Sequence, residues 1–120
     1  MHRCAVTLLT ISGFAVLPQA LGADAKVVPL MTQPLADVPN KEVLMLTVEY
    51  GPGDSSPIHR HNADVFVYVF EGAVMLGLQG RDPVRVEAGQ TFYEAPGDIH
   101  AVSSNASKTA KAKFVVVMVK

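Results

Sequence analysis

The chain has 120 residues, of which 49% are hydrophobic and 18% are charged, and its formal net charge is −1. This length suits a single domain, and the composition is that of a chain that buries a core rather than remaining disordered. The near-zero net charge gives no electrostatic basis for binding nucleic acid or an anionic membrane surface, so we expect neither as a partner.

Residues 1–25 have the three-part pattern of a secretory signal peptide. A basic start, MHR, precedes the uncharged apolar run CAVTLLTISGFAVL, and small residues follow it. Cleavage is plausible after Gly22, Ala23 or Ala25, and Ala23-Asp24-Ala25 fits the A-x-A rule best. The run is shorter than the about 20 residues of a membrane span, and the alternative is a buried N-terminal helix. We therefore expect a periplasmic or secreted bacterial protein without stable membrane association after cleavage.

Cleavage at this point would remove His2 and Cys4, and Cys4 is the one cysteine of the chain. The mature protein would then have no disulfide, no thiolate metal ligand and no nucleophilic cysteine. Its histidines would be His59, His61 and His100.

The mature chain is expected to consist of an N-terminal extension or first strand at residues 26–42 and a single domain at residues 43–120. Strand-like segments alternate there with Gly- and Pro-containing turns: KEVLMLTVEY (41–50), ADVFVYVF (63–70), AVMLGLQG (73–80), VRVEAG (84–89), IHAVSSNAS (99–107) and KAKFVVVMVK (111–120). None has convincing 3.6-residue periodicity with helix caps. Short strands at this spacing favour an all-β fold, as an antiparallel sandwich or barrel.

Two of these strands, VFVYVF (65–70) and FVVVMV (114–119), are apolar on both faces. A strand of an antiparallel sheet usually turns one face to water, so a second apolar face indicates an additional covering element. A second sheet, the N-terminal segment around residues 27–30 or a second subunit could provide it. Of these we expect a second subunit, and therefore a homodimer.

The histidines are placed as metal ligands would be. His59 and His61 are two residues apart, so on a strand both point to the same face. His100 lies after a Gly- and Pro-containing turn at the start of another strand-like segment, and strand pairing could bring it to the same point. Neutral imidazole binds divalent Fe, Mn, Ni, Cu or Zn, and the pattern does not select among them. The alternative is that each histidine is a surface or hydrogen-bonded residue.

Glycines punctuate both histidine segments. Five residues separate Gly53 from His59-Arg60-His61, and Gly72 closes the first segment. The second segment runs from Gly89 through QTFYE and Ala95-Pro96-Gly97 to His100. These two segments resemble the histidine motifs of the cupin superfamily, and the resemblance covers roughly residues 43–120. It implies an antiparallel β-sandwich or jelly-roll barrel, frequently dimeric, that holds one divalent metal ion through the three histidines.

The sequence departs from the cupin motifs at four positions. Ala95 stands where the second motif has proline, and Pro96 and Asn105 each come one position late. The most consequential departure is Val65, because the family's glutamate at that place completes a site of three histidines and one carboxylate.

Two carboxylates could replace the missing glutamate. Asp64 would need a bulge, because strict alternation from His61 turns it to the opposite face, and it is otherwise a solvated aspartate. Glu94 either enters the pocket or is a charged residue at a strand end.

The resemblance implies a metal-dependent enzyme that acts on a small molecule, by dioxygenase-like or isomerase-like chemistry. Glu94 and Tyr93 are the candidates for acid–base chemistry, although Tyr93 could equally be a packed tyrosine, and no catalytic residue is assigned. The alternatives are a non-catalytic cupin that binds a metal or a small ligand, and a barrel with a vestigial site.

Overall fold

The computed structural model describes residues 25–120, so nearly all of the expected signal peptide lies outside the described residues. Within that range the chain forms these strands: β1 (Lys26–Pro34), β2 (Glu42–Tyr50), β3 (His59–Arg60), β4 (Asp64–Glu71), β5 (Ala73–Leu78), β6 (Val84–Glu87), β7 (Thr91–Glu94), β8 (Ile99–Asn105) and β9 (Ala112–Val119). No helix that could cross a membrane occurs in this part of the chain. The prediction of an all-β fold is confirmed.

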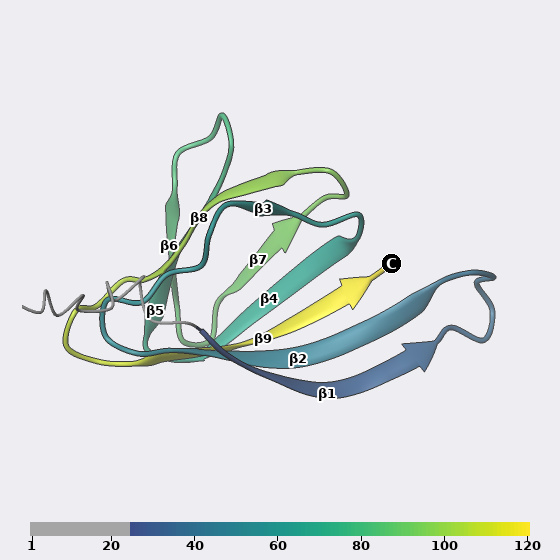
Figure 1. The fold of residues 1–120 in the computed structure, drawn as a ribbon, viewed down its shortest axis with the longest axis horizontal. Coiled ribbons are helices and arrows are strands. Elements are labelled where there is room, and N and C mark those ends of the chain that lie inside the picture. The colour runs from purple at the N-terminus through teal and green to yellow at the C-terminus, as the bar shows by residue number, and fades with distance from the viewer. Residues whose placement is uncertain (1–24) are drawn as a thin grey trace, which may run out of the picture.

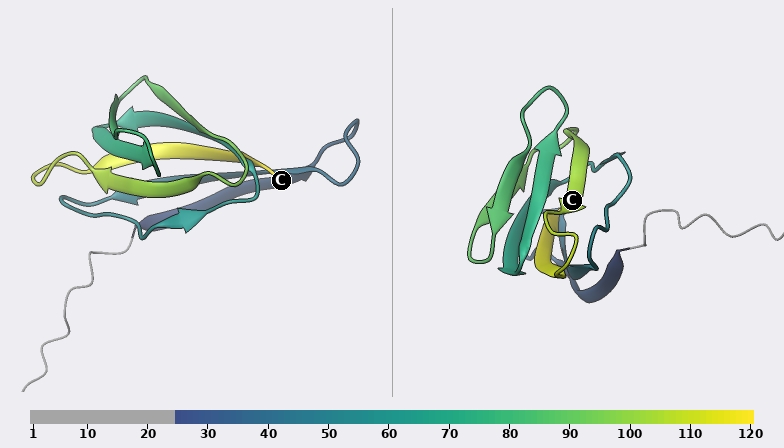
Figure 2. Two further views of the ribbon diagram at one scale, coloured as in Figure 1. Left: turned by 90° about the horizontal axis from the view of Figure 1, so that it is seen from above. Right: turned by 90° about the vertical axis from the view of Figure 1, so that its left-hand side faces the viewer.

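The strands form two antiparallel sheets, which lie face to face as a sandwich (Figures 1 and 2). One sheet has the strand order β1-β2-β9-β4-β7 and the other has the order β3-β8-β5-β6. The far end of the β1–β2 hairpin projects beyond the sandwich (Figure 1). This arrangement confirms the predicted sandwich or jelly-roll architecture.

Alternation along β4 separates the core from the outside of the five-stranded sheet. Val65, Val67 and Val69 are buried between the sheets, whereas Phe66 and Tyr68 point outward and are each 48% exposed. The second sheet therefore covers one apolar face of β4 and leaves the other open. The N-terminal segment at residues 27–30 does not cover it, because β1 pairs edge-on with β2 instead.

Two strand pairings carry the histidine segments to one place. The short strand β3 pairs with β8 so that His59 lies directly opposite His100. On the facing sheet, β4 pairs with β7 so that Val65 lies directly opposite Glu94. Residues from both histidine segments therefore meet in the space between the sheets.

Candidate metal centre

The three histidines lie together, as their spacing predicts. The ring centroids of His59 and His100 are 4.9 Å apart, and those of His59 and His61 are 4.7 Å apart. His100 is only 6% exposed, while His59 and His61 are half-buried. The H-x-H pair comes from β3 and the residue after it, and strand pairing with β8 supplies the third imidazole.

Glu94 lies beside these rings and is 4% exposed. Its Oε1 is 2.7 Å from Nδ1 of His100. This contact pairs Glu94 with Nδ1, whereas the buried Nε2 of His100 has no hydrogen-bond partner among the described residues. Buried polar atoms are rarely left unpaired, because desolvation without a partner is costly. The Nε2 atom of His100 therefore points to a partner that the described residues do not supply.

The other two candidates, Asp64 and Tyr93, lie outside the cavity between the sheets. Tyr93 is 48% exposed, and its hydroxyl donates a hydrogen bond to Asp64. That hydrogen bond is the main reason why the pKa of Tyr93 is raised, so the phenol stays protonated at neutral pH. Neither residue lines the cavity. Of the candidates from the sequence, the structure thus places Tyr93 and Asp64 outside the cavity and brings Glu94 into it.

Two histidines are held in states suited to ligation. His59 Nδ1 is 2.8 Å from the carbonyl oxygen of Pro57. If Nδ1 carries the proton and donates it there, the lone pair of Nε2 is free for a metal. The pKa of His61 is lowered, first by burial and then by the neighbouring His59, which favours the neutral imidazole that metals require.

The side chains of the three histidines and Glu94 do not point to one common centre in this structure. Within residues 25–120, no three His, Cys, Asp or Glu side chains stand around one point in the way that would hold an ion. The donor types nevertheless fit a divalent transition metal, since imidazole and carboxylate are its ordinary ligands. The unpaired Nε2 of His100 and the buried Glu94 carboxylate beside it also fit such an ion. Ligation would require these side chains to rotate toward a common point.

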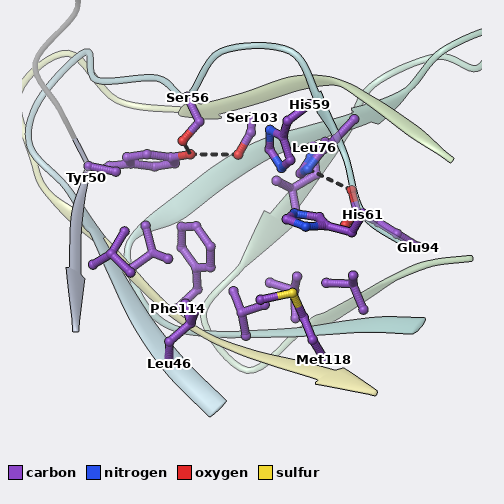
Figure 3. A pocket seen from close by; sticks show the side chains of 17 residues that line it. Leu46, Tyr50, Ser56, His59, His61, Leu76, Glu94, Ser103, Phe114 and Met118 are labelled. Atoms are coloured by element: carbon purple, nitrogen blue, oxygen red, sulfur yellow. Dashed lines mark hydrogen bonds and ion pairs between the residues drawn. The ribbon is translucent and has the colours of Figure 1, made fainter. Parts of the chain in front are cut away.

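The histidines and Glu94 occupy one end of a cavity of about 190 Å³ between the sheets (Figure 3). Apolar side chains from the five-stranded sheet, among them Leu46, Phe114 and Met118, line its opposite wall (Figure 3). A ligand entering this cavity would therefore meet polar groups on one side and hydrocarbon on the other.

Sequence reasoning missed a second polar group in the cavity. The hydroxyl of Tyr50 lies 2.5 Å from Ser56 Oγ and 2.7 Å from Ser103 Oγ, and Tyr50 is 1% exposed. We refer to these three residues as the hydroxyl chain (Figure 3). No local signal marks it, because Tyr50 and Ser103 are 53 residues apart and meet only through the sandwich.

Comparison with known proteins agrees with this architecture. A family model described as a cupin domain matches residues 46–118, which is more than half of the chain. No protein of curated function matches. An uncharacterised protein with a double-stranded β-helix domain from Klebsiella pneumoniae is similar at a TM-score of 0.66 and 16% identity, over 80% of this chain and 76% of its own.

Two enzymes are also similar in structure. Oxalate oxidase, solved with the substrate analogue glycolate, has a TM-score of 0.58 and 30% identity over 63% of this chain and 41% of its own. The DMSP lyase DddQ from Ruegeria pomeroyi has a TM-score of 0.57 and 18% identity over 63% of this chain and 37% of its own. This chain thus spans less than half the length of either enzyme.

Proposed function

The chain belongs to the cupin family, and we propose that it holds one divalent metal ion through His59, His61, His100 and Glu94. The observation that carries this proposal is the buried Nε2 of His100, which has no partner among the described residues, beside the Glu94 carboxylate and two further imidazoles. A bound ion would provide the missing partner of Nε2. The proposed ligand set restores one carboxylate to a site whose first motif has Val65 in its place.

We further propose that the metal site acts on a small molecule. A bound metal would polarise an oxygen atom of the ligand or, if redox-active, react with oxygen. The likeness to oxalate oxidase and to a DMSP lyase supports a metal-dependent enzyme. The protein's own contribution would be to orient the ligand against the apolar wall and to exclude water from it.

One observation favours a second candidate, a cupin that binds a metal or small ligand without converting it. Apart from the four proposed ligands, Tyr50 is the one titratable residue among the described residues lining the cavity. If all four ligands are engaged, little remains for acid–base chemistry. Oxygen consumption measured with the iron-loaded protein over a panel of thiols, diketones and phenols would identify an oxygen-dependent enzyme. A chromatographic search for products of the same compounds detects chemistry that uses no oxygen, and a binder gives neither signal.

The metal site is tested by metal analysis of untagged protein after exposure to Fe, Mn, Ni, Cu or Zn salts. We expect about one divalent ion per chain in the wild type and almost none in His59→Ala/His100→Ala, with both proteins folded by circular dichroism. Arg60→Ala is the matched control, because Arg60 lies between the two ligands and is exposed. Wild-type protein that takes up far less than one ion of every metal would contradict the proposal.

We also propose that the protein is a homodimer through the outer face of the five-stranded sheet. Four aromatic side chains stand there, between 45% and 48% exposed: Phe66, Tyr68, Phe70 and Tyr93. Val115 and Val117 continue the same hollowed surface. An apolar surface of this kind is unusual on a monomer, and in a two-fold dimer the same surface of each subunit covers that of the other.

We also propose that the mature chain is exported from the cytoplasm, as residues 1–25 lead us to expect.

Tyr68→Lys is expected to convert the dimer to a monomer at micromolar concentration, because a Lys charge at the centre of the interface would be desolvated without a partner. Analytical ultracentrifugation measures the change in mass. Ile58→Lys serves as control, since Ile58 is 71% exposed and lies outside this face. A wild-type protein that sediments as a single chain would refute the dimer.

A further inference from the structure

The hydroxyl chain can donate one more hydrogen bond than it uses. Tyr50, Ser56 and Ser103 together carry three hydroxyl hydrogens, and their two mutual contacts account for two of them. The third hydrogen is free to point to an acceptor. Since all three residues line the cavity, a bound ligand could provide that acceptor.

The hydroxyl chain lies at a ligand's length from the histidines. His100 and Ser103 both line the cavity from β8, where an irregularity in the pairing with β5 lies between them. Their Cα atoms are three residues apart, which is about 10 Å at the rise of a regular strand. The cavity of about 190 Å³ is only slightly larger than the engineered cavity of about 150 Å³ that holds benzene. A ligand with on the order of six to nine non-hydrogen atoms could therefore reach from one polar end to the other.

The cavity is poorly suited to a ligand with two negative charges. No Lys or Arg is among the described residues that line it. A divalent ion together with the Glu94 carboxylate would leave one positive charge, which a single negative charge on the ligand neutralises. A second negative charge would be buried against apolar side chains such as Phe114 and Val116 without a counter-ion, which is costly.

We propose that the cavity takes a small molecule with at most one negative charge. One oxygen of this molecule faces the metal end, and a second oxygen accepts a hydrogen bond from the hydroxyl chain. This inference rests on the proposed metal site and adds the ligand class to it. Ser103 and Tyr50 are positioning residues here, because they hold the ligand at the end remote from the metal.

The charge limit is tested with oxamate and oxalate, which have the same number of non-hydrogen atoms but differ by one charge. The measurement is calorimetric titration of the zinc-loaded, full-length protein, in which zinc is redox-inert. We expect oxamate to bind at least as tightly as oxalate, although oxalate has the greater charge with which to attract zinc. Oxalate binding tenfold tighter than oxamate would overturn the charge limit.

The role of the hydroxyl chain is tested with catechol and 1,2,4-benzenetriol, titrated anaerobically. The triol adds one hydroxyl across the ring, and we expect it to bind two- to tenfold tighter than catechol, as one hydrogen bond allows. Ser103→Ala should reduce that ratio to about one, whereas Ser104→Ala, the next residue along β8 and outside the cavity, should keep it. If Ser103→Ala does not fold, Ser103→Cys provides the same test, because a thiol of similar size is a much weaker hydrogen-bond donor than a hydroxyl.

The outcomes separate the two proposals. Zinc uptake is measured first, and a protein that takes up no zinc overturns the metal site and this inference with it. A protein that takes up one zinc ion per chain, yet shows the same triol preference in wild type and Ser103→Ala, overturns the hydroxyl-chain role alone.

Discussion

Exchanging the two residues of one cross-strand pair, in the variant Val65→Glu/Glu94→Val, is expected to preserve metal affinity, whereas Glu94→Val alone should lower it about 100-fold. Val65 and Glu94 lie directly opposite each other in the β4–β7 ladder. Both are buried and line the same cavity. Opposite residues have Cβ atoms roughly 5 Å apart on one face of the sheet, so a Glu side chain from either position can reach the same point.

The measurement is competition for zinc against a chelator of known affinity, with Glu87→Val as the control for loss of a carboxylate. Glu87 is exposed and pairs with Arg85 on β6, away from the cavity. Unchanged affinity in Glu94→Val would mean that the metal is held by the histidines alone. A loss that the exchange variant does not restore would mean that Glu94 acts at its own position, by orienting His100 through Nδ1, rather than as a ligand.

The sequence predicts the meeting of the histidines because the signals involved are local. Two histidines at spacing two share a strand face whatever the sheet order, and the surrounding glycines identify the motifs that carry them. The all-β fold follows in the same way from short strands separated by turns. These predictions need no knowledge of which strand lies next to which.

The position of Glu94 depends on information that is not local. Whether a residue at the end of β7 faces the cavity depends on the pairing of β7 with β4, and hence on the register that places it opposite Val65. Once that register is known, alternation assigns Tyr93 to the outer face. The hydroxyl chain is less predictable still, because Tyr50 and Ser103 come from different sheets.

The two apolar faces of β4 illustrate the same limit. The sequence indicates correctly that both faces of this strand are apolar, and it predicts that a second subunit covers the outer face. The structure shows that one face meets the second sheet, while the outer face, with Phe66 and Tyr68, stays open within the described chain. A sequence pattern reports that a face is apolar, but the covering element depends on assembly.

Gly72→Ala is expected to lower the free energy of unfolding by about 2–5 kcal/mol, the sum of backbone strain and overpacking. Gly72 has a φ of 69°, in the left-handed region that disfavours a side chain. A Cβ atom at this position would also stand 2.5 Å from the carbonyl oxygen of Lys111 and 3.1 Å from Cα of Ala112. Both atoms belong to the backbone at the start of β9, so no side-chain rotation can relieve the contact.

Gly80→Ala separates these two causes, because Gly80 has a similar φ of 84° but no atom within 4 Å of the added Cβ. It should therefore cost only the strain, about 1–2 kcal/mol. Urea unfolding of the metal-free proteins measures both changes. A larger loss of stability in Gly72→Ala than in Gly80→Ala would show that the close approach of the β4–β5 turn to β9 requires glycine at the end of the first histidine motif. This requirement would hold whether or not a metal is bound. Equal losses in the two variants would show instead that φ alone explains this glycine, and that the turn can move away from β9.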